Sequence, residues 1–146
     1  WALDTFTLND PAQRDGSYRE TLSMVEQELM RELADQPPLG PPAEGRISRR
    51  VKHFPLTPEV QVFADDKGTH YILEVVAADR PGLLARIAYT LAKANVNVAS
   101  AKINTLGDRA EDVFLIDGAR LHDEQALLRL ETALYEELKS PVPQPA

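Results

Sequence analysis

The chain has 146 residues, of which 43% are hydrophobic, enough to bury one ordinary core but hardly a second. Its 16 Lys and Arg residues against 23 Asp and Glu give a net charge of −7, which argues against a nucleic-acid partner because phosphate backbones require clustered positive charge. Cysteine is absent, so disulfides, thiolate nucleophiles and Cys-ligated zinc are excluded. No apolar run approaches the ~18 residues that span a bilayer, and we expect a cytoplasmic protein.

Two segments near the start of the chain are similar to two segments near its end. Residues 2–8 match residues 110–116, with Ala, Asp and Phe identical, and the pattern of residues 25–33 matches that of 130–138. A strand and a helix repeated in the same order indicate a tandem duplication, although two amphipathic helices can also resemble each other by chance. We therefore expect residues 1–35 to be the C-terminal half of a preceding domain, in a chain that looks like an excised piece of a larger protein.

This half-domain is expected to need a partner. Its helix carries the apolar stripe Leu22, Val25, Leu29 and Leu33 without a sheet to cover it. An isolated strand and helix cannot offset an ordering entropy of about 1–2 kcal/mol per residue. We therefore predict a homodimer or higher assembly, in which residues 1–35 pack against another chain or against a sheet edge.

The remaining chain is divided by proline content. Residues 36–57 contain repeated proline pairs, which interrupt helices and strand ladders, so this segment is predicted to be an extended linker. A complete domain is predicted over residues 58–139. The proline-rich residues 140–146 are predicted to be an unstructured tail.

The domain at 58–139 begins with a predicted hairpin. Residues 60–63 and 70–77 are rich in strand-forming side chains, and turn-forming residues separate them. The second run is apolar at nearly every position, which indicates a central strand. No strand is predicted after the last helix, so we expect residues 60–63 to occupy the vacant sheet edge by pairing with the strand around Leu73.

A helix, two strands and a second helix complete the predicted domain. Apolar residues recur with helical spacing after Pro81 and Gly82, and Pro81 suits a first helical position. Strand patterns follow at 95–103 and 112–116, and a leucine stripe marks a helix at 123–138. The order strand, strand, helix, strand, strand, helix predicts a ferredoxin-like α+β fold, with a four-stranded antiparallel sheet and two helices on one face.

The segment Asp79-Arg80-Pro81-Gly82-Leu83-Leu84, followed after the helix by Asn95-Val96-Asn97-Val98, resembles the signature of the ACT domain, an amino-acid-sensing module of metabolic regulators. Residues 79–85 and 101–114 are similar in more detail to the last domain of the bacterial bifunctional PII uridylyltransferase/uridylyl-removing enzymes, which end in tandem ACT domains. The resemblance implies a regulatory region that binds glutamine and controls uridylylation of the PII nitrogen-signalling protein. The nucleotidyltransferase and phosphohydrolase domains of that family, for which Mg²⁺ is the expected cofactor, have no counterpart here, so we expect neither catalysis nor a cofactor in this region.

The residues themselves offer no catalytic constellation. His53, His70 and His122 are scattered, and none has a metal-ligand partner at helical spacing. Asp65 and Asp66 are turn residues. Asp112 repeats an aspartate of the first unit and is interpreted as part of the fold. We therefore predict no catalytic residue and no metal ligand.

A binding site is better supported. Backbone N–H groups at residues 81–84 suit a carboxylate, and Gly82 lets a ligand approach the backbone closely. Asp79 is expected to receive an α-ammonium group, and Asn97, expected at the same end of the sheet, to read a polar side chain through its amide. The candidate ligand-binding residues are Asp79, Arg80, Gly82, Leu83, Leu84, Asn97 and Val98.

Three alternatives stay open. The sequence at 79–84 is also compatible with a plain start of a helix after a strand. The domain can alternatively be a ligand-free interaction or dimerisation module of a metabolic regulator, using a sheet edge and a helix face. It can also contribute to a catalytic surface that only further domains would complete.

Overall fold

The computed structural model describes residues 18–37, 40, 42, 56–119 and 121–139. The chain divides into two compact units, residues 1–38 and 39–146. The strand predicted at 2–8, the tail at 140–146 and most of the predicted linker lie outside the described residues. Within the described part of the chain, no helix has both the length and the apolar character needed to cross a membrane.

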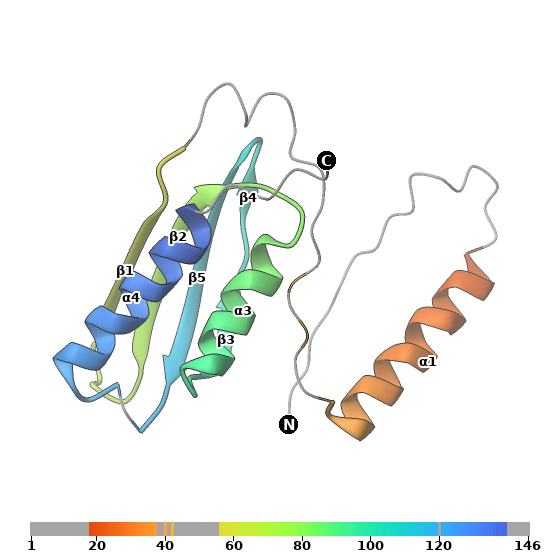
Figure 1. Cartoon of the computed structure of the whole chain (residues 1–146), viewed down its shortest axis with the longest axis horizontal. Helices are drawn as coiled ribbons and strands as arrows, with labels where there is room; N and C mark the ends of the chain where they lie inside the picture. The colour runs from red at the N-terminus through yellow and green to blue at the C-terminus, as the bar shows by residue number, and fades with distance from the viewer. Residues whose placement is uncertain (1–17, 38–39, 41, 43–55, 120, 140–146) are drawn as a thin grey trace. The chain divides into compact units, whose positions relative to one another are not determined.

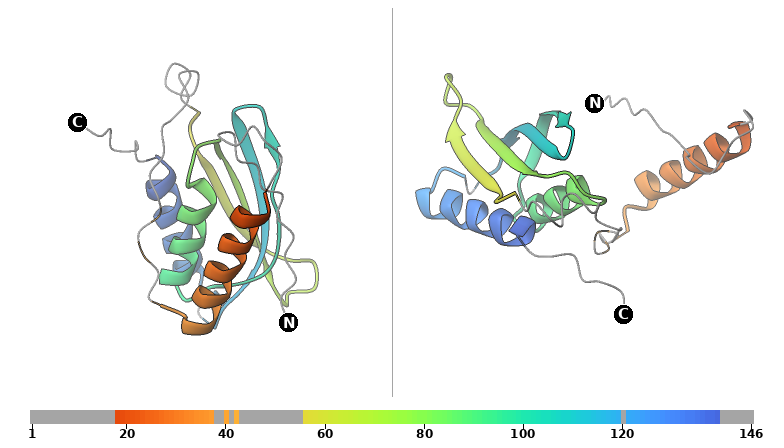
Figure 2. Two further views of the ribbon diagram at one scale, coloured as in Figure 1. Left: turned by 90° about the vertical axis from the view of Figure 1, so that its right-hand side faces the viewer. Right: turned by 90° about the horizontal axis from the view of Figure 1, so that it is seen from above.

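The second unit is an antiparallel sheet with helices on one of its faces (Figures 1 and 2). The strands are β1 (Glu59–Ala64), β2 (Tyr71–Ala78), β3 (Asn97–Lys102), β4 (Thr105–Leu106) and β5 (Arg109–Asp117), and the helices are α3 (Leu83–Lys93) and α4 (Glu124–Lys139). The four long strands lie in the order β1-β2-β5-β3. This confirms the predicted α+β sandwich, with the short strand β4 as an addition.

Strand β4 exists because the chain reverses tightly before β5. Gly107 has a φ of 65°, a left-handed conformation that glycine adopts without strain. This lets Thr105 pair with Ala110 and Leu106 with Arg109. Two residues are too few to give a periodic signal, so the sequence indicated only a turn here.

The predicted hairpin forms as expected. Val62 pairs with Leu73, which places β1 at the sheet edge beside the central strand β2. The carboxylate of Asp65 accepts hydrogen bonds from the backbone N–H groups of Thr69 at 2.8 Å and His70 at 3.1 Å, which fixes the turn between the strands. The N–H group of Val62 donates to Glu131 Oε1 on α4 at 2.7 Å, so the outer edge of β1 is covered at this point.

The core lies between the sheet and the two helices. Strand β2 buries alternate residues, as expected for a strand with one covered face, and β5 does the same. The helices contribute their apolar stripes to one cluster. Its members are Leu73, Val75, Ala77, Leu83, Ile87, Leu91, Ala110, Phe114, Ile116, Leu121, Leu130, Leu134 and Leu138.

Strand β3 differs from the other long strands because every residue in it is exposed. It lies at the other edge of the sheet, and among the described residues it pairs only with β5. The register shifts between Val98 and Ser100, so Ala99 forms a bulge. None of its six residues is buried by the described part of the unit.

The first unit contributes the helix α1 (Arg19–Asp35), which includes the helix predicted at 25–33. It buries none of its residues, and the side chains of Leu22, Leu29 and Leu33 are 53%, 53% and 67% exposed. The helix ends at Gln36, whose left-handed conformation lets its N–H group donate to the Glu32 carbonyl oxygen at 3.0 Å.

Candidate functional site

The turn between β2 and α3 carries the sequence that suggested a binding site. Asp79 continues from β2, and its N–H group donates to the Asp108 carbonyl oxygen at 2.8 Å. Gly82 is the N-cap of α3 with a φ of 79°, which explains glycine at this position. The first helical residue is therefore Leu83 and not Pro81 as predicted, because the left-handed Gly82 lies between Pro81 and the helix.

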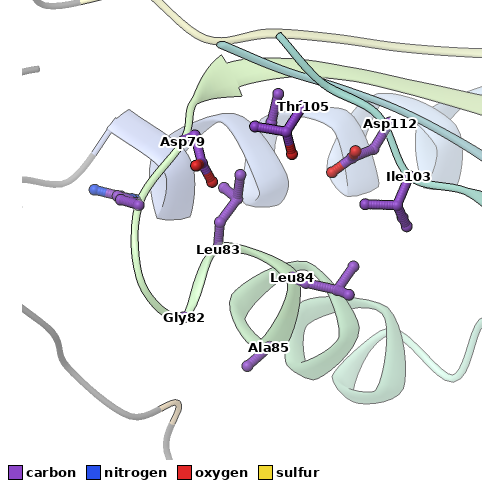
Figure 3. A pocket seen from close by; sticks show the side chains of 10 residues that line it. Asp79, Gly82, Leu83, Leu84, Ala85, Ile103, Thr105 and Asp112 are labelled. Atoms are coloured by element: carbon purple, nitrogen blue, oxygen red, sulfur yellow. The ribbon is translucent and has the colours of Figure 1, made fainter. Parts of the chain in front are cut away.

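The turn opens onto a hollow of about 190 Å³ between the sheet and the start of α3 (Figure 3). This is below the ~300–1,000 Å³ of sites for drug-sized ligands, so the hollow suits a ligand no larger than a free amino acid. Its lining is Asp79, Arg80, Gly82, Leu83, Leu84, Ala85, Ile103, Thr105, Ala110 and Asp112. Five of the predicted site residues, Asp79, Arg80, Gly82, Leu83 and Leu84, are thus brought together.

Asp112 gives the hollow a buried acidic wall. It is only 2% exposed, and its Oδ1 atom accepts a hydrogen bond from the Asn104 N–H group at 3.2 Å. Burial raises the pKa of Asp112, the Asn104 hydrogen bond opposes this shift, and the negative charge of Asp79 raises the pKa further. The two carboxylates therefore share one electrostatic environment.

The start of α3 provides hydrogen-bond donors on another side of the hollow. The Leu83 N–H group donates to the Arg80 carbonyl oxygen at 3.1 Å, so it is not available as the sequence suggested. For the N–H groups of Leu84 and Ala85, the described residues offer no backbone acceptor. These two groups at a helix N-terminus favour an anion, whereas Asp79 and Asp112 favour a cation.

Arg80 connects the turn to the far end of α4. Its Nη2 atom donates to the carbonyl oxygens of Leu138 at 3.0 Å and Glu137 at 3.3 Å, where a helix leaves acceptors unpaired. Arg86 of α3 forms an ion pair with the Glu137 carboxylate at 2.5 Å. Burial and the neighbouring Arg86 lower the pKa of Arg80, and Glu137 opposes this shift.

Asn97 and Val98 do not join this group, and the expectation that Asn97 lies at the same end of the sheet is wrong. Asn97 pairs with Asp117 at the end of β5, whereas Ala78, just before Asp79, pairs with Arg109 at its beginning. The nine residues of β5 separate the two positions by about 27 Å. The physical reason is α3 itself, because the helix carries the chain to the opposite end of the sheet before β3 begins. The Asn97 amide donates instead to Asp117 at 3.4 Å.

Five lining residues were missed by the sequence reasoning, namely Ala85, Ile103, Thr105, Ala110 and Asp112. A signal for Asp112 was present, because it alternates with Ala110, Phe114 and Ile116 on the buried face of β5. A carboxylate in such a series must be buried. Ile103 and Thr105 follow the irregular end of β3, where no pattern indicated their position.

Metal binding finds no support in the described part of the chain. Within it, no group of three or more His, Asp or Glu side chains could hold a metal ion. His70 contacts the Thr69 hydroxyl group through Nδ1 at 3.0 Å, and the His122 ring lies edge-on to Tyr71. His53 lies outside the described residues.

The fold and the turn define a class of protein. The family model of the ACT domain matches residues 71–134, so this part of the chain belongs to the ACT-domain family. The chain is also 52% identical, over 139 residues and 95% of its length, to the bifunctional uridylyltransferase/uridylyl-removing enzyme of Chromobacterium violaceum. It is 49% identical over 134 residues, 92% of its length, to the enzyme of the same name from Burkholderia vietnamiensis.

The chain spans 16% of the length of each of these two relatives, so it is similar to a regulatory ACT-domain region within them. Among solved structures, it is similar to an unknown protein from Galdieria sulphuraria with a TM-score of 0.42 and 21% identity. That match covers 48% of this chain and 39% of the other.

Proposed function

We propose that this chain is the amino-acid-sensing region of a PII uridylyltransferase/uridylyl-removing enzyme, that it binds L-glutamine, and that it thereby controls uridylylation of the PII protein. The main support is the composition of the hollow at the β2–α3 turn. Backbone donors of Leu84 and Ala85 and carboxylates of Asp79 and Asp112 line one small space. This arrangement complements a zwitterion, whose carboxylate and ammonium groups lie close together.

The relatives supply the second support. Two proteins are named for uridylyl transfer and removal, and this chain is 52% and 49% identical to them over the 139 and 134 residues that match. Catalysis, its expected Mg²⁺ and contact with the PII protein belong in this proposal to other parts of a longer protein. The region described here supplies the signal, and Arg80 provides a physical connection from the site to the end of α4.

A neighbouring ACT domain would explain the remaining predicted residues. Strand β3 is an open edge, and antiparallel pairing of two such edges centred near Ser100 would bring Asn97 of one domain toward Ile103 of the other. In that arrangement Asn97 and Val98 contribute to a site on the adjacent domain. The homo-oligomer predicted from the sequence is consistent with this proposal.

The alternative function, a ligand-free interaction module, is favoured by the same edge. Val98, Ile103 and Leu106 are 40%, 46% and 57% exposed, which gives the edge an apolar surface. Isothermal titration calorimetry with L-glutamine separates the two functions, because only the sensor releases or absorbs heat of binding.

The decisive variant is at Gly82. Replacing Gly82 with Asp places a negative charge beside the expected ligand carboxylate and should abolish glutamine binding. The matched control is Gly82→Asn, which has the same size and tolerates the same left-handed φ of 79° without the charge. The control should weaken binding much less than the Asp variant.

Two results would contradict the proposal. One is that millimolar L-glutamine produces no heat and shifts no amide resonance between residues 79 and 84. The other is that Gly82→Asp, introduced into an intact enzyme of this kind, leaves the response of PII uridylylation to glutamine unchanged.

A further inference from the structure

We propose that Asp112 is the specificity-determining residue of the hollow, and that it binds the α-ammonium group of the ligand together with Asp79. This inference rests on the function proposed above and extends it to a residue that the sequence assigned to the fold alone. It also restricts the ligand class to primary amines that carry a nearby carboxylate.

The position of Asp112 separates it from an ordinary structural carboxylate. It is only 2% exposed, on the same face of β5 as the core residues Phe114 and Ile116. Its Oδ1 atom is satisfied by the Asn104 N–H group, but the described residues provide no hydrogen-bond donor to Oδ2. Among the described residues, only Arg86 Nε is a fully buried side-chain polar atom without a partner, so Oδ2 is not sealed in the core. It is accessible from the hollow that Asp112 lines, where a ligand donor can bind it.

The direction of the side chain supports this assignment. Figure 3 shows the carboxylate of Asp112 pointing into the hollow above Leu84, beside Thr105. Asp79 reaches the same space from the end of β2. Two acidic groups in one cavity repel each other, and a shared cation relieves this repulsion.

Among the described residues, the two arginines nearest this turn have other partners. Arg80 lines the hollow, but its Nη2 atom is bound to the carbonyl oxygens of Glu137 and Leu138. Arg86 is paired with the Glu137 carboxylate. An ammonium group has three donors, one of which can serve Oδ2 of Asp112, while the negative charge of Asp79 in the same hollow also favours a cation.

The chemistry of the hollow therefore discriminates between ligands. A zwitterionic amino acid presents its ammonium group to Asp79 and Asp112 and its carboxylate to the start of α3. A ligand that keeps the carboxylate but lacks the ammonium group meets two negative charges without compensation.

The test uses calorimetry on the 146-residue chain with two probes, L-glutamine and glutaramic acid, which has a hydrogen in place of the ammonium group. The unaltered protein should bind L-glutamine at least about tenfold more tightly, as expected for charge-assisted hydrogen bonds. Asp112→Asn keeps an acceptor for the Asn104 N–H group, and it should lower glutamine affinity at least about tenfold and shrink the discrimination. The matched control Asp66→Asn removes the same charge from an exposed turn and should change neither affinity.

Each contrary outcome identifies which idea fails. If the unaltered protein does not bind L-glutamine, the proposed glutamine-sensing function is wrong. If it binds glutamine, but Asp112→Asn binds equally well, the assignment of Asp112 is wrong and the sensor remains. If Asp112→Asn does not fold by circular dichroism, equal affinity of the unaltered protein for both probes still overturns the assignment.

Discussion

The ion pair between Arg86 and Glu137 joins α3 to α4. We expect removal of the Glu137 charge to lower the free energy of unfolding more than removal of Arg86 does. The side chain of Arg86 is 11% exposed and that of Glu137 is 35% exposed. Replacing Glu137 with Gln leaves a buried guanidinium without its counter-charge, close to the second guanidinium of Arg80. Replacing Arg86 with Met leaves a carboxylate that water can reach.

The expected magnitudes follow from these exposures. Breaking a fully buried pair by removing one partner costs about 3–5 kcal/mol, and exposed pairs are worth about 0–1 kcal/mol. We expect Glu137→Gln to lower the free energy of unfolding by about 2–3 kcal/mol. For Arg86→Met we expect about 0–1 kcal/mol, because the change also removes Nε, a buried atom without a hydrogen-bond partner among the described residues.

Urea unfolding followed by circular dichroism at neutral pH measures both changes, and the double variant completes a cycle. The double variant should resemble Arg86→Met, since no buried charge is then left unpaired. Glu136→Gln, one residue away on the same helix and exposed, is the control and should cost less than about 1 kcal/mol. A larger loss for Arg86→Met than for Glu137→Gln would refute the reasoning.

Three further predictions concern stability and assembly. Leu134 is fully buried, so Leu134→Ala should lower the free energy of unfolding by about 2–5 kcal/mol in thermal or urea melts, whereas Leu128→Ala, 63% exposed, should cost less than about 0.5 kcal/mol. Burial raises the folded-state pKa of Asp112, so the folded protein holds this proton more tightly than the unfolded chain does. The stability that comes with the protonated carboxyl group is fully present below the unfolded pKa of about 3.9, and it is lost as pH rises through the folded pKa. Asp112→Asn should therefore gain stability relative to the unaltered protein as pH rises above about 4, and an unchanged difference between their urea melts would contradict this. Deleting residues 1–35 should leave the ACT domain folded and weaken self-association by light scattering, and an unaltered monomer before and after deletion would show that α1 needs no partner.

The fold could be predicted from the sequence because local and long-range signals agree. The alternating burial of β2 and the helical spacing of α3 are readable from side-chain periodicity alone. The pairing of β1 with β2 could be predicted because the sequence showed no strand after the last helix that could fill the edge beside β2. Strand β4 could not be predicted, since a two-residue strand has no period.

The site was predicted only in part, for a topological reason. Residues 79–84 are contiguous, so their proximity was certain once the turn was recognised. Asn97 was misplaced because strand direction was not followed through α3, and the structure puts it at the opposite end of the sheet. Asp112 was overlooked because its match with the first repeat suggested a purely structural residue, although a buried carboxylate can serve both purposes.

The two edges of the sheet are not equivalent, and this limits how copies of the domain can join. On β1, the Val62 N–H group donates a hydrogen bond to Glu131 of α4. On β3, all six residues are exposed, and no described residue pairs with its outer edge. Pairing of two β3 edges joins two domains and leaves no further β3 edge open. Growth through β3 alone therefore stops at two domains, and a protein with tandem copies can form closed pairs through this edge without extending into a fibre.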